Sequence, residues 1–288
     1  MSEPKDLTKP FESQRSHLRA VAYRMLGSPS EADDAVQEAW LRLNSSNTDD
    51  IANLGGWLTT VVARICLGIL RARRSRREDF DAEAVDPIAD TKRDPEQQAL
   101  LADSVGVALL VVLDRLSAAE RVAFVLHDVF DLQFDEIAAI VDRTPDAARQ
   151  LASRARRRVR GETTSNSDLQ SQRVVVDAFL AALRAGDFEG LLAVLDPDVV
   201  VRIDAAPGAP REFRGAANWA RGATAAFSRF ARFVQPALVN GSVGLVFAPG
   251  GKLSRALSFT FADGRIARAE IITDSNRLQQ LDLSVLDD

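Results

Sequence analysis

Apolar residues recur at the helical period along the first quarter of the chain. Over residues 11–77 they return every three or four positions in three successive stretches, which is the pattern of amphipathic helices. The sequence Ser-Pro-Ser-Glu at 28–31 predicts a boundary with a capping box, because serine suits the N-cap, proline the first helical position and glutamate the third. We therefore expect a first domain in which helices pack on helices.

The helical period returns at about residue 97 and continues to residue 160. A second capping box at 117–120 predicts the start of a helix, and a shorter helix is expected over about 134–141. A tight connection at 142–143 leads to Thr144, which can cap a longer, basic helix. Two short helices, a turn and a longer basic helix are the outline of a helix-turn-helix.

Two polar segments separate these regions. Residues 78–96 hold eight acidic and only two basic residues, with few large apolar ones, and we interpret them as an acidic linker. Residues 162–167 are polar and follow a glycine, which indicates a second linker.

After residue 168 the pattern changes from helical to mixed. Two helices and a strand are expected first, and Asn240-Gly241 and Asp263-Gly264 are hairpin signals between β-rich runs. This part is predicted to be an α+β domain with an antiparallel meander. The expected helices cover 169–185, a short segment after 187 and 216–227, and the expected strands cover 199–203, 232–239, 242–248, 253–262 and 265–272.

Composition narrows the class of protein. The 288 residues are 46% apolar and 27% charged, which is typical of a folded protein of about two domains or more. One cysteine and two histidines exclude a disulfide framework and a cysteine-cluster zinc site, and they make a histidine-rich metal site or a conventional catalytic triad unexpected, so we expect no metal and no cofactor. Residues 1–10 carry charges without an apolar core, and we see no long uncharged apolar run, so we expect a cytoplasmic protein without membrane contact.

The net charge is −5, but the chain contains two clusters of basic residues. One lies on the longer helix of the predicted helix-turn-helix, where Arg and Gln suit base edges and phosphates of DNA. The other, within 71–77, follows the third helix of the first domain. The alternatives are a solvated basic face for the first cluster and complementation of the helix dipole for the second.

Several segments resemble extracytoplasmic-function (ECF) sigma factors. Ala-Tyr-Arg-Met-Leu-Gly at 22–27 and the segments 31–42 and 57–67 are similar to sigma domain two, and 121–130 and 147–156 are similar to sigma domain four. The chain most resembles the sigma factor J-type subgroup, whose members carry a C-terminal SnoaL-like domain of the nuclear-transport-factor-2-like fold.

The resemblance implies a domain order. It comprises two all-α domains, sigma domain two and sigma domain four with its helix-turn-helix, followed by an α+β SnoaL-like domain. The expected bounds are 8–77, 97–161 and 168–288, with the acidic linker at 78–96. In relatives of this subgroup a Trp-Leu-Pro-Glu-Pro-like segment often follows domain two, and the linker here has none.

The resemblance also implies roles for individual residues. Core RNA polymerase would be bound through its β′ clamp helices and its β flap, and the acidic linker would thread toward the active-site cleft. The residues implied for the clamp helices are Asp34, Gln37, Glu38 and Arg42. Those implied for the −10 promoter element are Trp57, Arg64, Arg71, Arg73 and Arg74. Those implied for the −35 element are Arg149, Gln150, Ser153, Arg154 and Arg156.

The C-terminal domain is interpreted as a regulator of an alternative sigma factor rather than as an enzyme. It is expected to contact the sigma domains or to bind a small molecule in a pocket. A bifunctional protein that transforms a small molecule is one alternative, and a plain DNA-binding repressor is another. The carboxylates that would line such a pocket are Asp204, Glu212, Asp263, Glu270 and Asp274, and the arginines that would dock on the acidic linker or helix are Arg211, Arg214, Arg221, Arg229 and Arg232.

Overall fold

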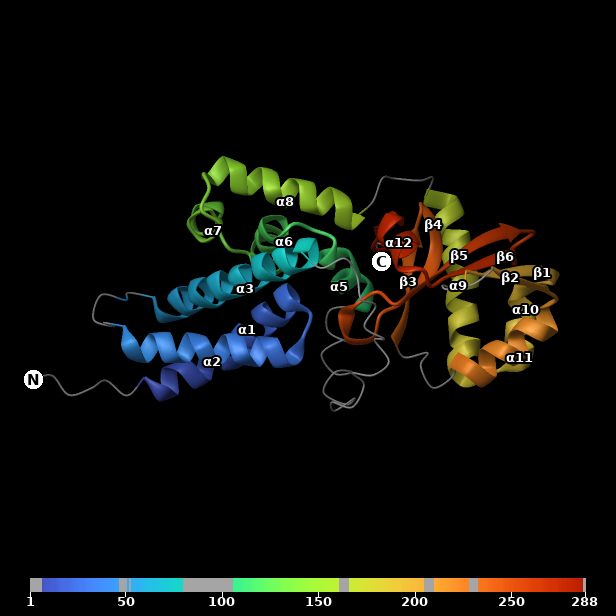
Figure 1. Cartoon of the computed structure of the whole chain (residues 1–288), viewed down its shortest axis with the longest axis horizontal. Coiled ribbons are helices and arrows are strands. Elements are labelled where there is room, and N and C mark those ends of the chain that lie inside the picture. Colours follow the sequence, from blue (N-terminus) through green and yellow to red (C-terminus); the bar gives the residue numbers. More distant parts are fainter. Residues whose placement is uncertain are drawn as a thin grey trace, which may run out of the picture. The chain divides into compact units, whose positions relative to one another are not determined.

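A computed structural model describes seven segments of the chain: residues 7–46, 51, 53–79, 106–160, 166–204, 210–227 and 233–286 (Figure 1). They belong to two compact units, which we describe separately. The first unit comprises Met1–Glu83 with Leu113–Arg156, and the second comprises Ala84–Val112 with Arg157–Asp288. The predicted acidic linker lies outside the described residues, apart from the end of the helix that precedes it.

Three helices form the N-terminal part of the first unit, as predicted: α1 (Thr8–Leu26), α2 (Pro29–Ser45) and α3 (Leu54–Asp79). Their apolar stripes bury one another, with Leu18, Leu43 and Leu58 fully buried. Between α1 and α2 the hydroxyl of Ser28 accepts a hydrogen bond from the Glu31 amide at 3.5 Å. The predicted capping box is only half formed, because the Glu31 carboxylate pairs with Arg73 of α3 instead.

The second helical region contains α5 (Val107–Asp114), α6 (Ala118–Phe124), a π-helix η1 (Val125–Val129), α7 (Phe134–Val141) and α8 (Pro145–Arg160). The capping box of Ser117 and Glu120 is present, as predicted. Between α7 and α8, Asp142 adopts a left-handed φ of 59°, and the Thr144 hydroxyl accepts from the Ala147 amide at 3.2 Å. The helix-turn-helix is therefore confirmed, whereas the π-helix was not foreseen.

The C-terminal part is an α+β domain. It holds helices α9 (Asn166–Ala185), α10 (Phe188–Val194), α11 (Ala216–Phe227) and α12 (Ser275–Gln280). Its strands are β1 (Leu195–Ile203), β2 (Arg211–Arg214), β3 (Val234–Val239), β4 (Ser242–Phe247), β5 (Arg255–Ala262), β6 (Arg265–Ile272) and β7 (Leu283–Ser284). They form one sheet in the order β2-β1-β6-β5-β4-β3-β7.

The predicted antiparallel meander β3-β4-β5-β6 is confirmed, and β1 joins it in parallel to β6. Both predicted hairpin turns form with left-handed φ angles of 51° at Asn240 and 50° at Asp263. Strands β2 and β7 and helix α12 were missed. Each has six residues or fewer, too short for a hydrophobic period to be visible.

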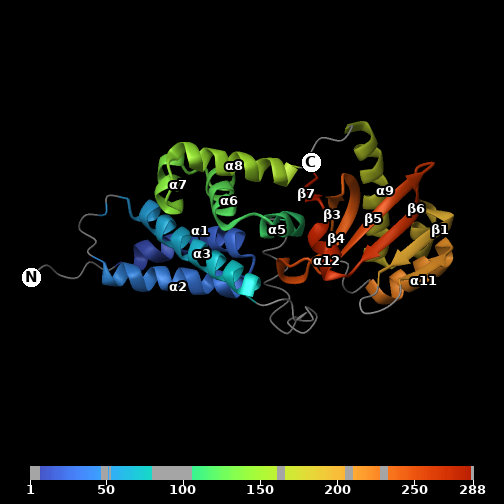
Figure 2. The same cartoon turned by 45° about the horizontal axis from the view of Figure 1, so that its top comes forward.

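Helices α9, α10 and α11 pack on one face of this sheet (Figure 2). The core beneath them is aromatic. Phe179 of α9 lies 5.2 Å from Trp219 of α11 and 5.8 Å from Phe259 of β5, measured between ring centroids. All three side chains are at most 4% exposed, so the space between the helices and the sheet is filled by the protein itself.

Candidate nucleic-acid interface

Helix α8 presents a polar, basic face. Ala148, Ala152 and Ala155 are fully buried against the rest of the helix-turn-helix. The residues predicted for DNA contact that lie on the opposite, exposed side are Arg149, Gln150, Ser153 and Arg154. Because the buried residues are small alanines, the apolar side of α8 is narrow and the basic side takes up the rest of the helix surface.

Two of the basic residues of α8 are held by neighbouring side chains. The Arg149 guanidinium bonds Asp146 at 2.7 Å and lies 5.2 Å from the ring of Phe134 in α7. Arg156, also predicted for DNA, pairs with Asp128 of the π-helix at 2.6 Å. Arg156 is therefore tied to the protein in this conformation, whereas Arg154 is exposed.

Helix α3 brings three of the five residues predicted for the −10 element onto one side. Trp57, Arg64 and Arg71 are spaced by seven residues, which is close to two helical turns. Arg64 and Arg71 are exposed, and Trp57 is half-buried. Arg74 is exposed about a quarter turn away, and the side chains of residues 76–79 lie outside the description.

Arg73 differs from its neighbours, because it points back into the helical bundle. Its guanidinium donates to the Leu26 carbonyl at 3.0 Å and pairs with the Glu31 carboxylate. These two contacts fasten the turn between α1 and α2 to the end of α3. In this conformation Arg73 is engaged by the protein and is turned away from the Trp57–Arg64–Arg71 side.

Helix α2 carries the acidic surface predicted for polymerase. Its residues Asp34, Gln37 and Arg42 are exposed, and Arg42 pairs with Glu38 at 2.9 Å. The structure adds Leu41, which is 56% exposed in the middle of this surface. Sequence reasoning missed it, although Leu41 falls outside the stripe of small and branched residues that α2 buries.

Arg121 of α6 is a charged group that sequence reasoning did not single out. It is 2% exposed and lies beside Gly27, where a Cβ would stand 3.6 Å from one of its guanidinium nitrogens. Burial lowers the pKa of Arg121 to about 10, against the opposing effect of Asp114. Burial also raises the pKa of the neighbouring Cys66 thiol to about 12, so this thiol stays protonated at neutral pH.

The carboxylates considered for a C-terminal pocket do not converge. Arg277 binds Asp204 at 2.8 Å and Glu270 at 2.9 Å, while Asp274 caps α12 by accepting from the Arg277 amide. The hydrogen bond with Glu270 is the main cause that raises the pKa of Arg277. These groups therefore form an ion-pair network that ties α12 to the edge of the sheet.

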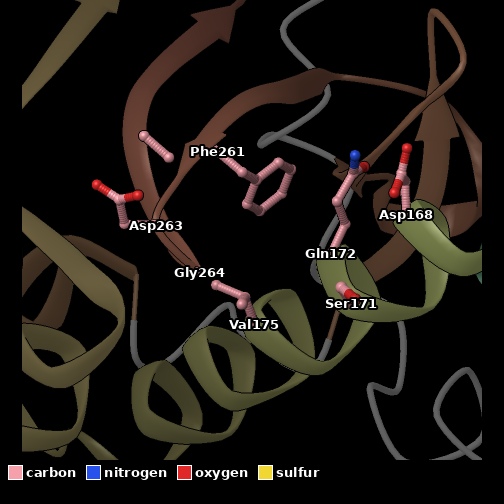
Figure 3. Close-up of a pocket in the computed structure, with 8 residues that line it drawn as sticks. Asp168, Ser171, Gln172, Val175, Phe261, Asp263 and Gly264 are labelled. Atoms are coloured by element: carbon pink, nitrogen blue, oxygen red, sulfur yellow. The ribbon is translucent and has the colours of Figure 1, made fainter.

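A shallow hollow of about 220 Å³ lies between α9 and the turn joining β5 to β6 (Figure 3). The ring of Phe261 projects between the helix and the turn, with Gln172 on the helical side. The amide oxygen of Gln172 accepts a hydrogen bond from the Val243 backbone amide, so this oxygen already has a partner within the fold. Asp263 lines this hollow, but the other four carboxylates considered for a pocket do not.

The helical part of the chain thus combines a helix-turn-helix with exposed basic sides on α3 and α8 and an acidic side on α2. Two family models match it. Sigma-70 region 2 matches residues 11–76, and Sigma-70, region 4 matches residues 106–159.

Curated relatives extend the similarity over most of the chain. The ECF RNA polymerase sigma factor SigJ of Mycobacterium tuberculosis is 38% identical over 89% of this chain and 88% of its own length. The probable ECF RNA polymerase sigma factor SigI of the same species is 39% identical over 72% of this chain and 73% of its own. A crystal structure of M. tuberculosis SigJ matches with 33% identity and a TM-score of 0.46, covering 94% of this chain and 97% of that one.

The chain belongs to the ECF RNA polymerase sigma factors. It is an alternative sigma factor, which works with core RNA polymerase and promoter DNA to direct transcription initiation. The stretch Leu54–Ser75 of α3 is long and apolar enough to cross a membrane by length and composition. In the structure it is a core helix of the first unit, with Leu58, Val62 and Cys66 fully buried.

The two contacts of Arg73 should stabilise the folded protein. Replacing Arg73→Ala removes two hydrogen bonds from a charged donor, so we expect the free energy of unfolding to fall by about 1–3 kcal/mol. Arg71→Ala, on the exposed side of the same helix, is the control and is expected to change it by less than about 0.5 kcal/mol. Urea denaturation followed by circular dichroism measures both values, and equal values for the two variants would contradict the structural role of Arg73.

Proposed function

We propose that α8 and α3 bind the two promoter elements and that α2 binds core RNA polymerase. The single observation that carries this proposal is the side of α8 that exposes Arg149, Gln150, Ser153 and Arg154 above a buried alanine stripe. Arg and Gln make bidentate hydrogen bonds with base edges in the major groove. This face therefore reads the −35 element, while Arg156 and the basic last turn contact phosphates.

Helix α3 is proposed to bind the −10 element. An aromatic ring and two cations repeated every seven residues suit a single strand, because bases stack on the ring while phosphates meet the arginines. Trp57, Arg64 and Arg71 are the principal contacts, with Arg74 at the margin. Contact of Arg73 with DNA would first require it to leave Glu31.

Helix α2 is proposed to bind the β′ clamp helices of core polymerase. The exposed Leu41 gives the polar surface of Asp34, Gln37, Glu38 and Arg42 an apolar centre, which is the usual anatomy of a protein–protein contact. The region-4 helices would contact the β flap, and the segment 78–96 would run toward the active-site cleft. Both contacts place the protein in the cytoplasm, where polymerase and promoter are found.

The C-terminal domain is proposed to modulate this activity and not to catalyse a reaction. We propose the bounds 168–288 for this domain and 8–77 and 97–161 for the two sigma domains. The Val285 amide donates to the Val159 carbonyl in the last turn of α8 at 2.7 Å. Because the last carbonyls of a helix have no partner within it, this bond caps the recognition helix from the C-terminal tail.

Helix α5 supports the same role. Its sequence, Val-Ala-Leu-Leu-Val-Val-Leu-Asp, is apolar all round, and residues 107–112 belong to the compact unit of the C-terminal domain. A helix that is apolar on every side needs cover on more than one side. We infer that most of α5 is covered within the unit that contains the C-terminal domain.

The −35 assignment is tested on α8. Arg149→Ala and Arg154→Ala are each expected to weaken binding to a −35 duplex by about 5- to 150-fold, because each removes one base-edge contact. Arg15→Ala, an exposed arginine of α1, is the matched control and should change nothing. Fluorescence anisotropy at fixed salt measures the affinity, and loss of polymerase binding instead of DNA binding would overturn the assignment.

The polymerase surface is tested on α2. Leu41→Ala is expected to weaken binding to core RNA polymerase by at least about fivefold, because it truncates the apolar centre of the contact. Gln37→Ala should weaken it less, and −35 duplex binding should stay unchanged in both. Biolayer interferometry with immobilised core polymerase gives the dissociation constants, with Arg15→Ala again as control; wild-type affinity of Leu41→Ala would refute this surface.

The cap on α8 is tested at Val285. Val285→Pro removes the amide donor, whereas Val285→Ala keeps it. We expect the proline variant alone to bind promoter DNA about two- to fivefold more weakly and with a smaller dependence on salt, because the last turn frays and its arginines lose phosphate contacts. Indistinguishable salt titrations for the two variants would exclude a role for this bond.

A further inference from the structure

The side chain of Arg149 on α8 is held by two neighbours within the helix-turn-helix. Its Nη1 donates to Oδ1 of Asp146, three residues earlier on the same helix, at 2.7 Å. Its guanidinium also lies 5.2 Å from the centroid of the Phe134 ring on α7. A solvated arginine samples many rotamers, and ordering it on binding lowers the affinity. These two contacts therefore orient Arg149 before DNA is bound.

The Phe134 ring is itself held by the segment that precedes α7. It lies 4.0 Å from the His127 ring, measured between centroids. Nδ1 of His127 donates to the Leu132 carbonyl at 3.0 Å, because a carbonyl oxygen can only accept. His127 belongs to the π-helix η1, so a line of contacts runs from η1 through Phe134 to the guanidinium of Arg149.

The bond to Asp146 occupies only part of the guanidinium. In the described part of the chain, neither Nε nor Nη2 of Arg149 has a hydrogen-bond partner. Guanine presents two adjacent acceptors, N7 and O6, in the major groove, and two donors of one arginine suit them. Arg149 can thus keep its bond to Asp146 and still offer donors to a guanine.

The Asp146 carboxylate has a further effect on DNA binding. It lies in the first turn of α8 and its side chain is 85% exposed. In a helix-turn-helix this end of the second helix faces the bases. A carboxylate there repels phosphates whatever the sequence, so it weakens binding to all DNA. Since an exposed ion pair adds little to stability, the main effect of the pair is on how Arg149 meets DNA.

We propose that Asp146 and Phe134 are positioning residues that set the base specificity of Arg149. They orient its guanidinium toward guanine in the −35 element, while the charge of Asp146 disfavours DNA in which that guanine is missing. The inference rests on the −35 role proposed for α8. Asp146 and Phe134 act through Arg149, and this dependence separates a positioning role from a purely structural one.

The experiment measures base preference with the full-length protein. Duplexes randomised over the −35 element are selected for binding, which identifies the positions where wild-type protein requires guanine. Fluorescence anisotropy at fixed salt then gives dissociation constants for the preferred duplex, for duplexes with one guanine replaced, and for an unrelated duplex. The guanine preference is the ratio of the dissociation constants for the replaced and the preferred duplex.

Asp146→Ala is the principal variant. We expect it to lower the guanine preference about two- to tenfold, which is the size of the ordering cost of one long side chain. Its affinity for the unrelated duplex should rise, because a repelling carboxylate is gone. Asp135→Ala is the matched control, because it removes an exposed carboxylate from the first turn of α7, and it should leave the preference unchanged.

A double-mutant cycle tests the dependence on Arg149. Once Arg149→Ala has removed the guanidinium, adding Asp146→Ala should change the guanine preference no further. Phe134→Leu, which keeps an apolar side chain but removes the ring, should lower the preference only while Arg149 is present. Thermal unfolding followed by circular dichroism checks that each variant is folded.

The outcomes separate this inference from the proposed −35 function. A wild-type guanine preference in Asp146→Ala would overturn the inference, and so would an equal loss with and without the Arg149 guanidinium. In both cases a lowered preference in Arg149→Ala would leave the −35 assignment intact. An unchanged preference in Arg149→Ala would reject that assignment for Arg149 and this inference with it.

Discussion

Each amphipathic helix of this protein buries one apolar stripe, and most of the residues we propose for DNA and polymerase binding lie on the side that remains exposed. Helix α8 illustrates the arrangement, because Ala148, Ala152 and Ala155 are buried and Arg149 and Arg154 are exposed. Helix α2 buries its own stripe and leaves Leu41 exposed among polar residues. The recognition surfaces therefore depend on the same burial of apolar side chains that stabilises the fold.

Arginine serves three physical roles here that depend on its surroundings. Arg71 on α3 and Arg154 on α8 are exposed, and a guanidinium group in such a position suits phosphates and bases. Arg73 and Arg156 instead form ion pairs. The pair of Arg73 with Glu31 holds the turn between α1 and α2, and the pair of Arg156 with Asp128 holds the π-helix η1. Arg121 is instead buried, and its nearest carboxylate, Asp114, is 3.5 Å away.

In the C-terminal domain, aromatic side chains fill the space between the helices and the sheet, and an arginine pairs with two carboxylates. Phe179, Trp219 and Phe259 occupy the space between helices and sheet, and Arg277 neutralises Asp204 and Glu270 at the edge. The Val285 amide donates to the Val159 carbonyl at the end of α8.

The sequence alone predicted the longer helices, the capping box at Ser117, the turn at Thr144 and both β-hairpins, because each depends on residues close together in the chain. It also predicted the exposed basic face of α8, since such a face is visible in the helical period. Only the tertiary structure decided which arginines are engaged. Arg73 and Glu31 are 42 residues apart, and Arg64 and Ala139 are 75 apart, so no local pattern could pair them.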